Sequence, residues 1–149
     1  MRTDDNDANG IIFRYDDSGL YPNFYIVWFT KDHPSSKNDP YAGEIDYFDW
    51  ATPADQIQQN KISLHYVEGD ADGFNWYKLA EADWTRQDNR WYTWRVITDG
   101  TSISLYIDDN VSPTLTATDG NIATGYVGLV SFANANSHYD NIYVWQTET

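Results

Sequence analysis

The sequence predicts an all-β domain in which two antiparallel sheets pack face to face as a sandwich. Runs of strand-forming residues follow one another along almost the whole chain. Turn residues separate these runs at the regular spacing that is typical of sandwiches and barrels. Only residues 52–60 carry any helical pattern, where Thr52 could cap a single turn. We therefore expect roughly ten strands and almost no helix.

The first predicted strand covers residues 10–17 and alternates in character. Alternation places Ile11, Phe13 and Tyr15 on one face of the strand, with Arg14 on the other. One face of this strand is therefore expected to pack against a core.

The other strands are predicted from similar runs. Residues 23–30 are apolar on both faces, which favours a position in the middle of a sheet. An Asp99-Gly100 step between two alternating runs is a strong hairpin signal. The remaining predicted strands are residues 43–50, 60–69, 74–80, 90–100, 101–109, 114–118, 125–132 and 138–145.

Composition limits the classes of partner. A chain of 149 residues is long enough for one domain with its own core. Its 23 acidic residues against 9 basic ones give a formal charge of −14, which repels nucleic acids and anionic membrane surfaces. The absence of cysteine excludes a disulfide framework, and no apolar run is long enough to span a membrane. The 17% aromatic content suits ligand platforms.

Three stretches carry a family resemblance. They are "DNDANGIIFRYDDSGLYPNFYIVWF" at residues 5–29, "WYTWRVITDGTSISLYIDD" at residues 91–109 and "GYVGLVSFANANSHYDNIYVW" at residues 125–145. Their order resembles that of the thrombospondin C-terminal and laminin-G-like domains, which are concanavalin A-like jelly-roll sandwiches. The resemblance implies a non-catalytic, lectin-like carbohydrate-binding or adhesion module outside the cell or on its surface, with a polysaccharide or glycan as partner.

The same resemblance bears on domain organisation. Family members open with a strand before the acidic loop, and residues 1–4 are too few to supply it. We therefore interpret residues 1–149 as one sandwich domain cut from a larger secreted protein. We expect an open sheet edge beside residues 10–17 or 138–145, where another segment or another copy supplies the neighbouring strand.

An acidic run at residues 43–50 raises the alternative of an enzyme. The run resembles the E-x-D-x-x-E strand of glycoside hydrolase family 16, and "GLYPNF" at residues 19–24 resembles a second motif of that family. The resemblance implies Glu44 as nucleophile, Asp46 as its electrostatic helper and Asp49 in the acid/base position. Alternation places Asp49 on the opposite face, and a retaining mechanism needs its two carboxyl groups about 5–5.5 Å apart. We therefore interpret the run as lining a groove without catalysis.

Aromatic residues supply the other ligand contacts. Trp and Tyr rings stack on the apolar faces of sugars, while carboxylates and Arg bind their hydroxyl groups. Trp28 and Trp91 are expected in the core, whereas Trp76 and Trp84 lie in polar surroundings and are expected at the surface. The candidate ligand-binding residues are Arg14, Glu44, Asp46, Trp50, Trp76 and Trp84.

Calcium is the expected metal. Asp5 and Asp7 lie in an acidic loop, and hard carboxylate oxygens suit calcium. The family resemblance implies Asp140 as a further ligand at the start of the last strand. The acidic stretch at residues 68–73 lacks the final glutamate of an EF-hand loop and is interpreted as a plain hairpin turn. A purely structural module without sugar binding stays open as a further alternative.

Overall fold

The structure, a computed structural model, describes residues 1–3, 8–30, 60–132 and 136–146. These residues form eight strands and no helix, so no helix among them is long and apolar enough to cross a membrane. The strands are β1 (Ala8–Asp16), β2 (Asn23–Thr30), β3 (Lys61–Asp70), β4 (Gly73–Asp83), β5 (Trp94–Asp99), β6 (Ser102–Ile107), β7 (Leu115–Thr118) and β8 (Tyr126–Phe132). The predicted all-β class is confirmed.

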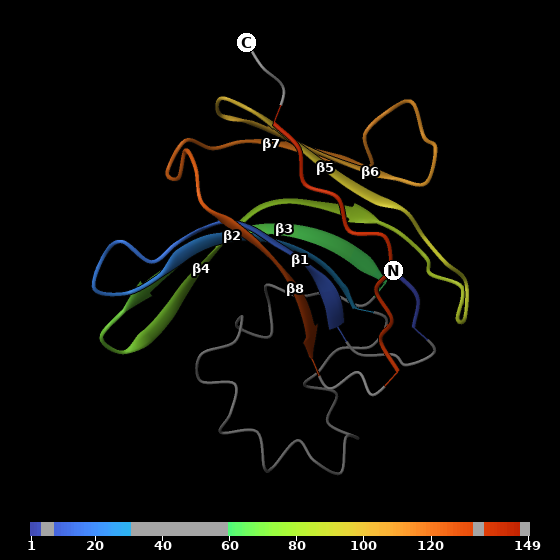
Figure 1. Cartoon of the computed structure of the whole chain (residues 1–149), viewed down its shortest axis with the longest axis horizontal. Coiled ribbons are helices and arrows are strands. Elements are labelled where there is room, and N and C mark those ends of the chain that lie inside the picture. The colour runs from blue at the N-terminus through green and yellow to red at the C-terminus, as the bar shows by residue number, and fades with distance from the viewer. Residues whose placement is uncertain (4–7, 31–59, 133–135, 147–149) are drawn as a thin grey trace.

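The strands form two antiparallel sheets, which lie one over the other (Figure 1). The larger sheet has the order β4-β3-β2-β1-β8 and the smaller sheet the order β5-β6-β7. The doubly apolar β2 lies in the middle of the larger sheet, as predicted. The β5–β6 hairpin turns at Gly100, whose φ of 56° lies in the left-handed region that glycine adopts readily. The β3–β4 hairpin turns between Asp70 and Gly73, which confirms the plain turn.

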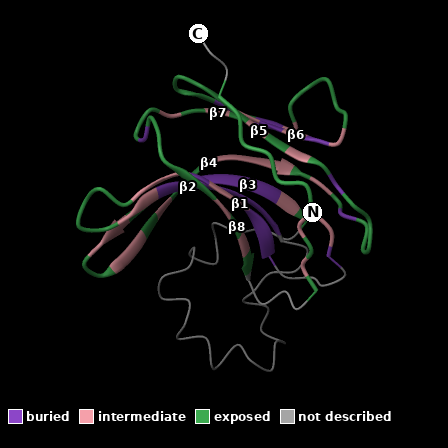
Figure 2. Cartoon of the chain, viewed as in Figure 1, coloured by how far each residue is buried: buried purple, intermediate pink, exposed green. Residues whose placement is uncertain are grey.

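The main core lies between the two sheets, on what we call the inner face of the larger sheet. Alternate residues of β2 and β3 pack there against alternate residues of β6. Figure 2 shows the middle strands of the larger sheet as buried. The fully packed members include Tyr25, Val27, Phe29, Ile62, Leu64, Ile103, Leu105 and Ile107.

The opposite face of the larger sheet, which we call the outer face, carries a second cluster. It is built around Phe24, Ile26, Trp28 and Val67, all of which are buried. Every member comes from the larger sheet. The larger sheet therefore has apolar residues on both faces, as the sequence of β2 indicates.

The predicted alternation of β1 fails after Phe13. Arg14 has a φ of 48°, and the pairing of β1 with both β2 and β8 shifts register at this point. Phe13 stacks on Tyr25 in the main core, whereas Tyr15 stacks on Phe24 in the second cluster. The bulge therefore moves Tyr15 to the outer face, because an extra residue reverses the side-chain alternation beyond it.

The predicted strand at residues 138–145 is wrong. His138 forms one isolated bridge with Arg2, and residues 139–146 belong to no strand. Asn141 has a φ of 52°, which interrupts the extended conformation that a strand needs. This segment is exposed from Asn141 to Gln146.

Tyr25 links the larger sheet to the loop after β7 by hydrogen bonds. Its hydroxyl donates a hydrogen bond to the Asp119 carboxylate and accepts one from the Ile122 amide at 3.2 Å. Burial and the neighbouring carboxylate raise the pKa of Tyr25 to about 12. The fold therefore holds the neutral phenol.

Replacing Tyr25 with Phe should destabilise the fold by about 1–3 kcal/mol, because the Ile122 amide and the Asp119 carboxylate lose their shared partner. A phenol whose pKa is raised on folding stabilises the protein below its ordinary pKa of 10.0, and this contribution is lost as pH rises toward about 12. Urea unfolding from pH 8 to 12 should therefore show the two proteins converging at high pH. The exposed Tyr126→Phe variant is the control, and an equal loss there would contradict the assignment.

Candidate functional site

A row of aromatic side chains crosses the outer face near the β1–β2 and β3–β4 turns. Tyr126 on β8 pairs with Tyr15 on β1, and the Tyr15 ring stacks on Phe24 of β2 at 5.9 Å between centroids. Phe24 meets two rings of β4 edge to face, Phe74 at 5.8 Å and Trp76 at 6.4 Å. We call these five residues the aromatic row.

The aromatic row has no member on β3, and the register of this strand explains why. The rings of Phe24 and Phe74 come from strands that are separated by β3, yet they touch. The β3 residue paired with Phe24 and with Trp76 is the buried Val67, while Gly69, which is paired with Phe74, has no side chain. A Cβ at Gly69 would lie 2.6 Å from the Pro22 carbonyl oxygen, so the position also needs glycine for close approach of the backbone.

The row contains one buried ring and four rings that are at least partly exposed. Phe24 is buried, Tyr15, Phe74 and Trp76 are half-buried, and Tyr126 is 70% exposed. Trp76 is also held in place by a parallel stack on the buried Trp28, at 5.4 Å and 13°. Rigid, half-exposed rings of this kind bind apolar faces of ligands at low conformational cost.

Two carboxylates lie in the turns at this end of the larger sheet, where strand alternation directs them away from the row. The Asp16 carboxylate follows Tyr15, and hydrogen bonds from the side chain and then the amide of Ser18 hold its pKa below the usual range. The Asp70 carboxylate accepts hydrogen bonds from the Asp72 amide at 2.8 Å and from the Asn75 side chain at 2.6 Å. Carboxylates accept hydrogen bonds from hydroxyl groups, but these two do not share a face with the rings, so the row offers ring faces alone.

Of the predicted ligand residues that the structure describes, Trp76 alone lies in the row. Arg14 instead donates hydrogen bonds to the carbonyls of Ile122 and Gly100, both at 2.9 Å, and so links β1 to the smaller sheet. Trp84 packs against the main core, where its ring contacts Phe29 at 4.8 Å. The prediction of a polar, exposed setting for Trp84 is therefore corrected.

Of the two tryptophans that were predicted to be core residues, one is buried and the other is exposed. Trp28 is buried as predicted, although in the outer-face cluster. Trp91 is 47% exposed, and the Arg2 guanidinium lies 5.3 Å from its ring. The prediction for Trp91 is wrong because this residue precedes β5 and therefore lies outside the strand alternation.

Several predicted site residues lie outside the described residues. They are Glu44, Asp46, Asp49 and Trp50 of the acidic run, and Asp5 and Asp7 of the proposed calcium loop. Asp140 is exposed and accepts a hydrogen bond from the Asn141 amide at 2.8 Å. Within the described part of the chain, no group of three or more His, Cys, Asp or Glu residues could hold a metal ion. Catalysis at the acidic run and calcium binding therefore stay predictions.

The sequence interpretation missed four members of the row. Phe24 could have been found from the doubly apolar pattern of residues 23–30, and Phe74 lies two residues before Trp76 on the same face of its strand. Tyr126 could have been found from its place in a predicted strand. Tyr15 could not, because simple alternation assigns it to the wrong face.

Comparisons with known proteins bear on the fold. No protein-family model and no curated protein matches the sequence. Among solved structures, the fold is similar to that of the carbohydrate-binding module CBM66 from Bacillus subtilis, with a TM-score of 0.55 and 16% sequence identity. The similarity covers 86% of this chain and 60% of that chain, so the protein spans less than two thirds of its neighbour's length. At this identity the likeness supports the sandwich fold alone.

Replacing Arg14 with Lys should lower stability by about 1–3 kcal/mol, because a single ammonium group cannot reproduce the two guanidinium hydrogen bonds that join the sheets. Chemical denaturation measures this effect. The matched control is the exposed Arg95→Lys, which should leave stability within about 0.5 kcal/mol of the wild type.

Proposed function

We propose that the protein is a non-catalytic module that binds a neutral polysaccharide or glycan on its aromatic row. The observation that carries this proposal is the arrangement of five rings across one sheet face. Sugar rings have apolar C–H faces that stack on aromatic rings. The fold similarity to a carbohydrate-binding module supports the same proposal.

Charge defines the class of glycan further. The formal charge of −14 disfavours sulfated or uronic-acid polymers, because like charges repel. Neutral polysaccharides fit the surface better. We also propose an extracellular or cell-surface location and an adhesive or enzyme-targeting role, which the resemblance to thrombospondin and laminin-G-like domains supports.

Affinity electrophoresis and calorimetry against a panel of neutral polysaccharides test the proposal. Tyr126→Ala and Trp76→Ala should each weaken binding by about 2–10-fold, since an aromatic contact contributes about 0.5–1.5 kcal/mol. Trp91→Ala is the matched control, because Trp91 is an exposed tryptophan outside the row. Tyr126 is the cleaner test, because its ring is the most exposed in the row and has the least packing to lose.

Two outcomes would contradict the proposal. If Trp91→Ala weakened binding as much as Tyr126→Ala and Trp76→Ala do, the aromatic row would not be the binding site. Release of reducing sugar by the wild-type protein, abolished in Glu44→Gln, would support the hydrolase instead.

We propose, in addition, a structural calcium ion held by Asp140 with Asp5 and Asp7. The bridge between Arg2 and His138 supports this proposal, because it joins the start of the chain to the residues before Asp140. Calcium at a hundredfold excess over its dissociation constant should stabilise the fold by about 2.7 kcal/mol. Thermal melting with calcium and with chelator measures the effect, which Asp140→Ala should abolish. Equal melting temperatures in all samples would reject the ion.

A further inference from the structure

The edge of β5 that faces away from β6 pairs with no strand of the described residues. Residues 93, 95, 97 and 99 face β6, since the β5–β6 hairpin closes at the Asp99–Ser102 pair and the Asp108 amide donates to the Thr93 carbonyl at 2.7 Å. In an antiparallel ladder the alternate residues face the other way. The amides and carbonyls of Trp94, Val96 and Thr98 therefore face an edge where they bind no backbone group of the described residues.

A short ladder already begins along this edge. Met1 and Tyr92 exchange two hydrogen bonds, in which the Met1 amino group donates to the Tyr92 carbonyl at 2.7 Å and the Tyr92 amide donates to Met1 at 2.9 Å. The Asn89 amide donates to the Thr3 carbonyl at 3.0 Å. On their other side, these first residues meet the C-terminal segment through the two hydrogen bonds between Arg2 and His138.

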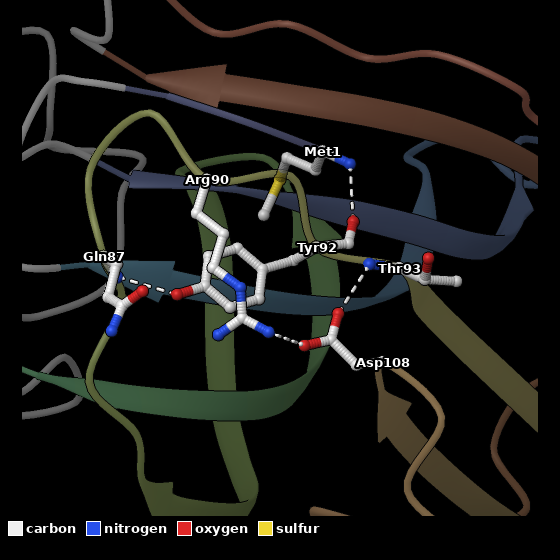
Figure 3. A network of polar contacts seen from close by, with 6 residues as sticks. All are labelled: Met1, Gln87, Arg90, Tyr92, Thr93 and Asp108. Carbon is white, nitrogen blue, oxygen red and sulfur yellow. Dashed lines mark hydrogen bonds and ion pairs between the residues drawn. The ribbon is translucent and has the colours of Figure 1, made fainter.

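The start of β5 is held rigidly for this pairing (Figure 3). The Tyr92 hydroxyl accepts a hydrogen bond from the Gln87 amide at 2.8 Å, and the Arg90 guanidinium lies over the Tyr92 ring. The Asp108 carboxylate binds both Arg90 at 2.7 Å and the Thr93 amide at 3.1 Å. The backbone of residues 92 and 93, where the pairing with Met1–Thr3 ends and β5 begins, is therefore held in position by these contacts.

The inner face of the larger sheet is left uncovered on the same side. Leu129 of β8 is paired with Ile11, whose side chain packs against the main core, and Val127 lies two residues away on the same face. Val127 is 46% exposed and Leu129 is 40% exposed, while Val27 and Leu64 on β2 and β3 are fully buried. Three strands thus cover the middle of a five-stranded sheet and leave the inner side of β8 in solvent.

We propose that the β5 edge accepts one added polypeptide strand, which runs antiparallel to β5 in line with Met1–Thr3. Its amides and carbonyls would complete the ladder at Trp94, Val96 and Thr98. Its inward side chains would be apolar and would cover the half-buried Trp94 and Val96 and the uncovered inner face beside β1. Its second edge would continue the pairing that the Arg2–His138 bridge begins, and so order the exposed residues 139–145 as a further strand.

The occupant is a neutral or basic strand of another sequence and not a second copy of this chain. Two copies at −14 each would repel one another across the contact. The six residues of β5 set the length of the strand. Alternation sets its pattern, with apolar residues opposite Trp94, Val96 and Thr98 and polar residues between them.

Amide hydrogen exchange, resolved by residue, tests the proposal with the peptide Val-Thr-Val-Thr-Val-Thr, whose side chains carry no charge. In the free protein the amides of Trp94, Val96 and Thr98 should exchange at least tenfold faster than those of Arg95 and Ile97. Saturating peptide should slow the first set at least tenfold. The control peptide carries proline in place of the central valine, which removes the N–H that would bind the Val96 carbonyl, and should give no protection.

A second measurement guards against weak binding of a short peptide. The same six residues fused ahead of Met1 raise the effective concentration to the millimolar range, and should protect the three amides without added peptide. No protection by either the fused or the free strand would overturn the proposal. Protection of these amides in the free protein, together with a dimer in sedimentation, would overturn it in favour of a second copy. None of these results depends on glycan binding, so the proposed function is tested independently of this proposal.

Discussion

The left-handed backbone at Arg14 decides how both faces of the larger sheet are used. Before it, β1 sends Phe13 into the main core, and after it the strand sends Tyr15 to the outer face, where the ring joins the aromatic row. The same bulge lets the Arg14 guanidinium reach the carbonyls of Gly100, in the β5–β6 turn, and of Ile122, in the loop after β7. A non-glycine residue in this conformation is unfavourable, and these two hydrogen bonds offset that cost.

The unequal size of the two sheets is the second constraint. A three-stranded sheet buries the inner residues of β2 and β3 but leaves those of β8 half in solvent. Apolar side chains then accumulate on the surface at Val127 and Leu129 and along residues 142–145. The high negative charge keeps such a surface soluble through mutual repulsion of the molecules. The exposed apolar side chains and the acidic composition are therefore linked properties of the same chain.

Local sequence patterns predicted the features that depend on local geometry. The central place of β2 followed from its double apolar pattern, and the β5–β6 turn from Asp99-Gly100. The face of Tyr15 could not be predicted, because one residue of irregular backbone reverses every alternation after it. Residues 138–145 look like a strand, yet pairing also needs a neighbouring edge, and sequence alone does not show whether one is present. The aromatic row joins residues from four strands, so it depends on register that no single run reveals.

The direction of the row limits the size of ligand that can use it. The rings follow one another from β8 through β1 and β2 to β4, so the row runs across the strands and not along one of them. Neighbouring strands lie about 4.8 Å apart, which gives roughly 19 Å for the four spacings from β8 to β4. A single sugar ring covers only part of that length. A chain of several sugars laid across the strands would reach both the exposed ring of Tyr126 and the Trp76 ring on the far strand. The surface is therefore suited to the interior of a polymer chain more than to a free monosaccharide.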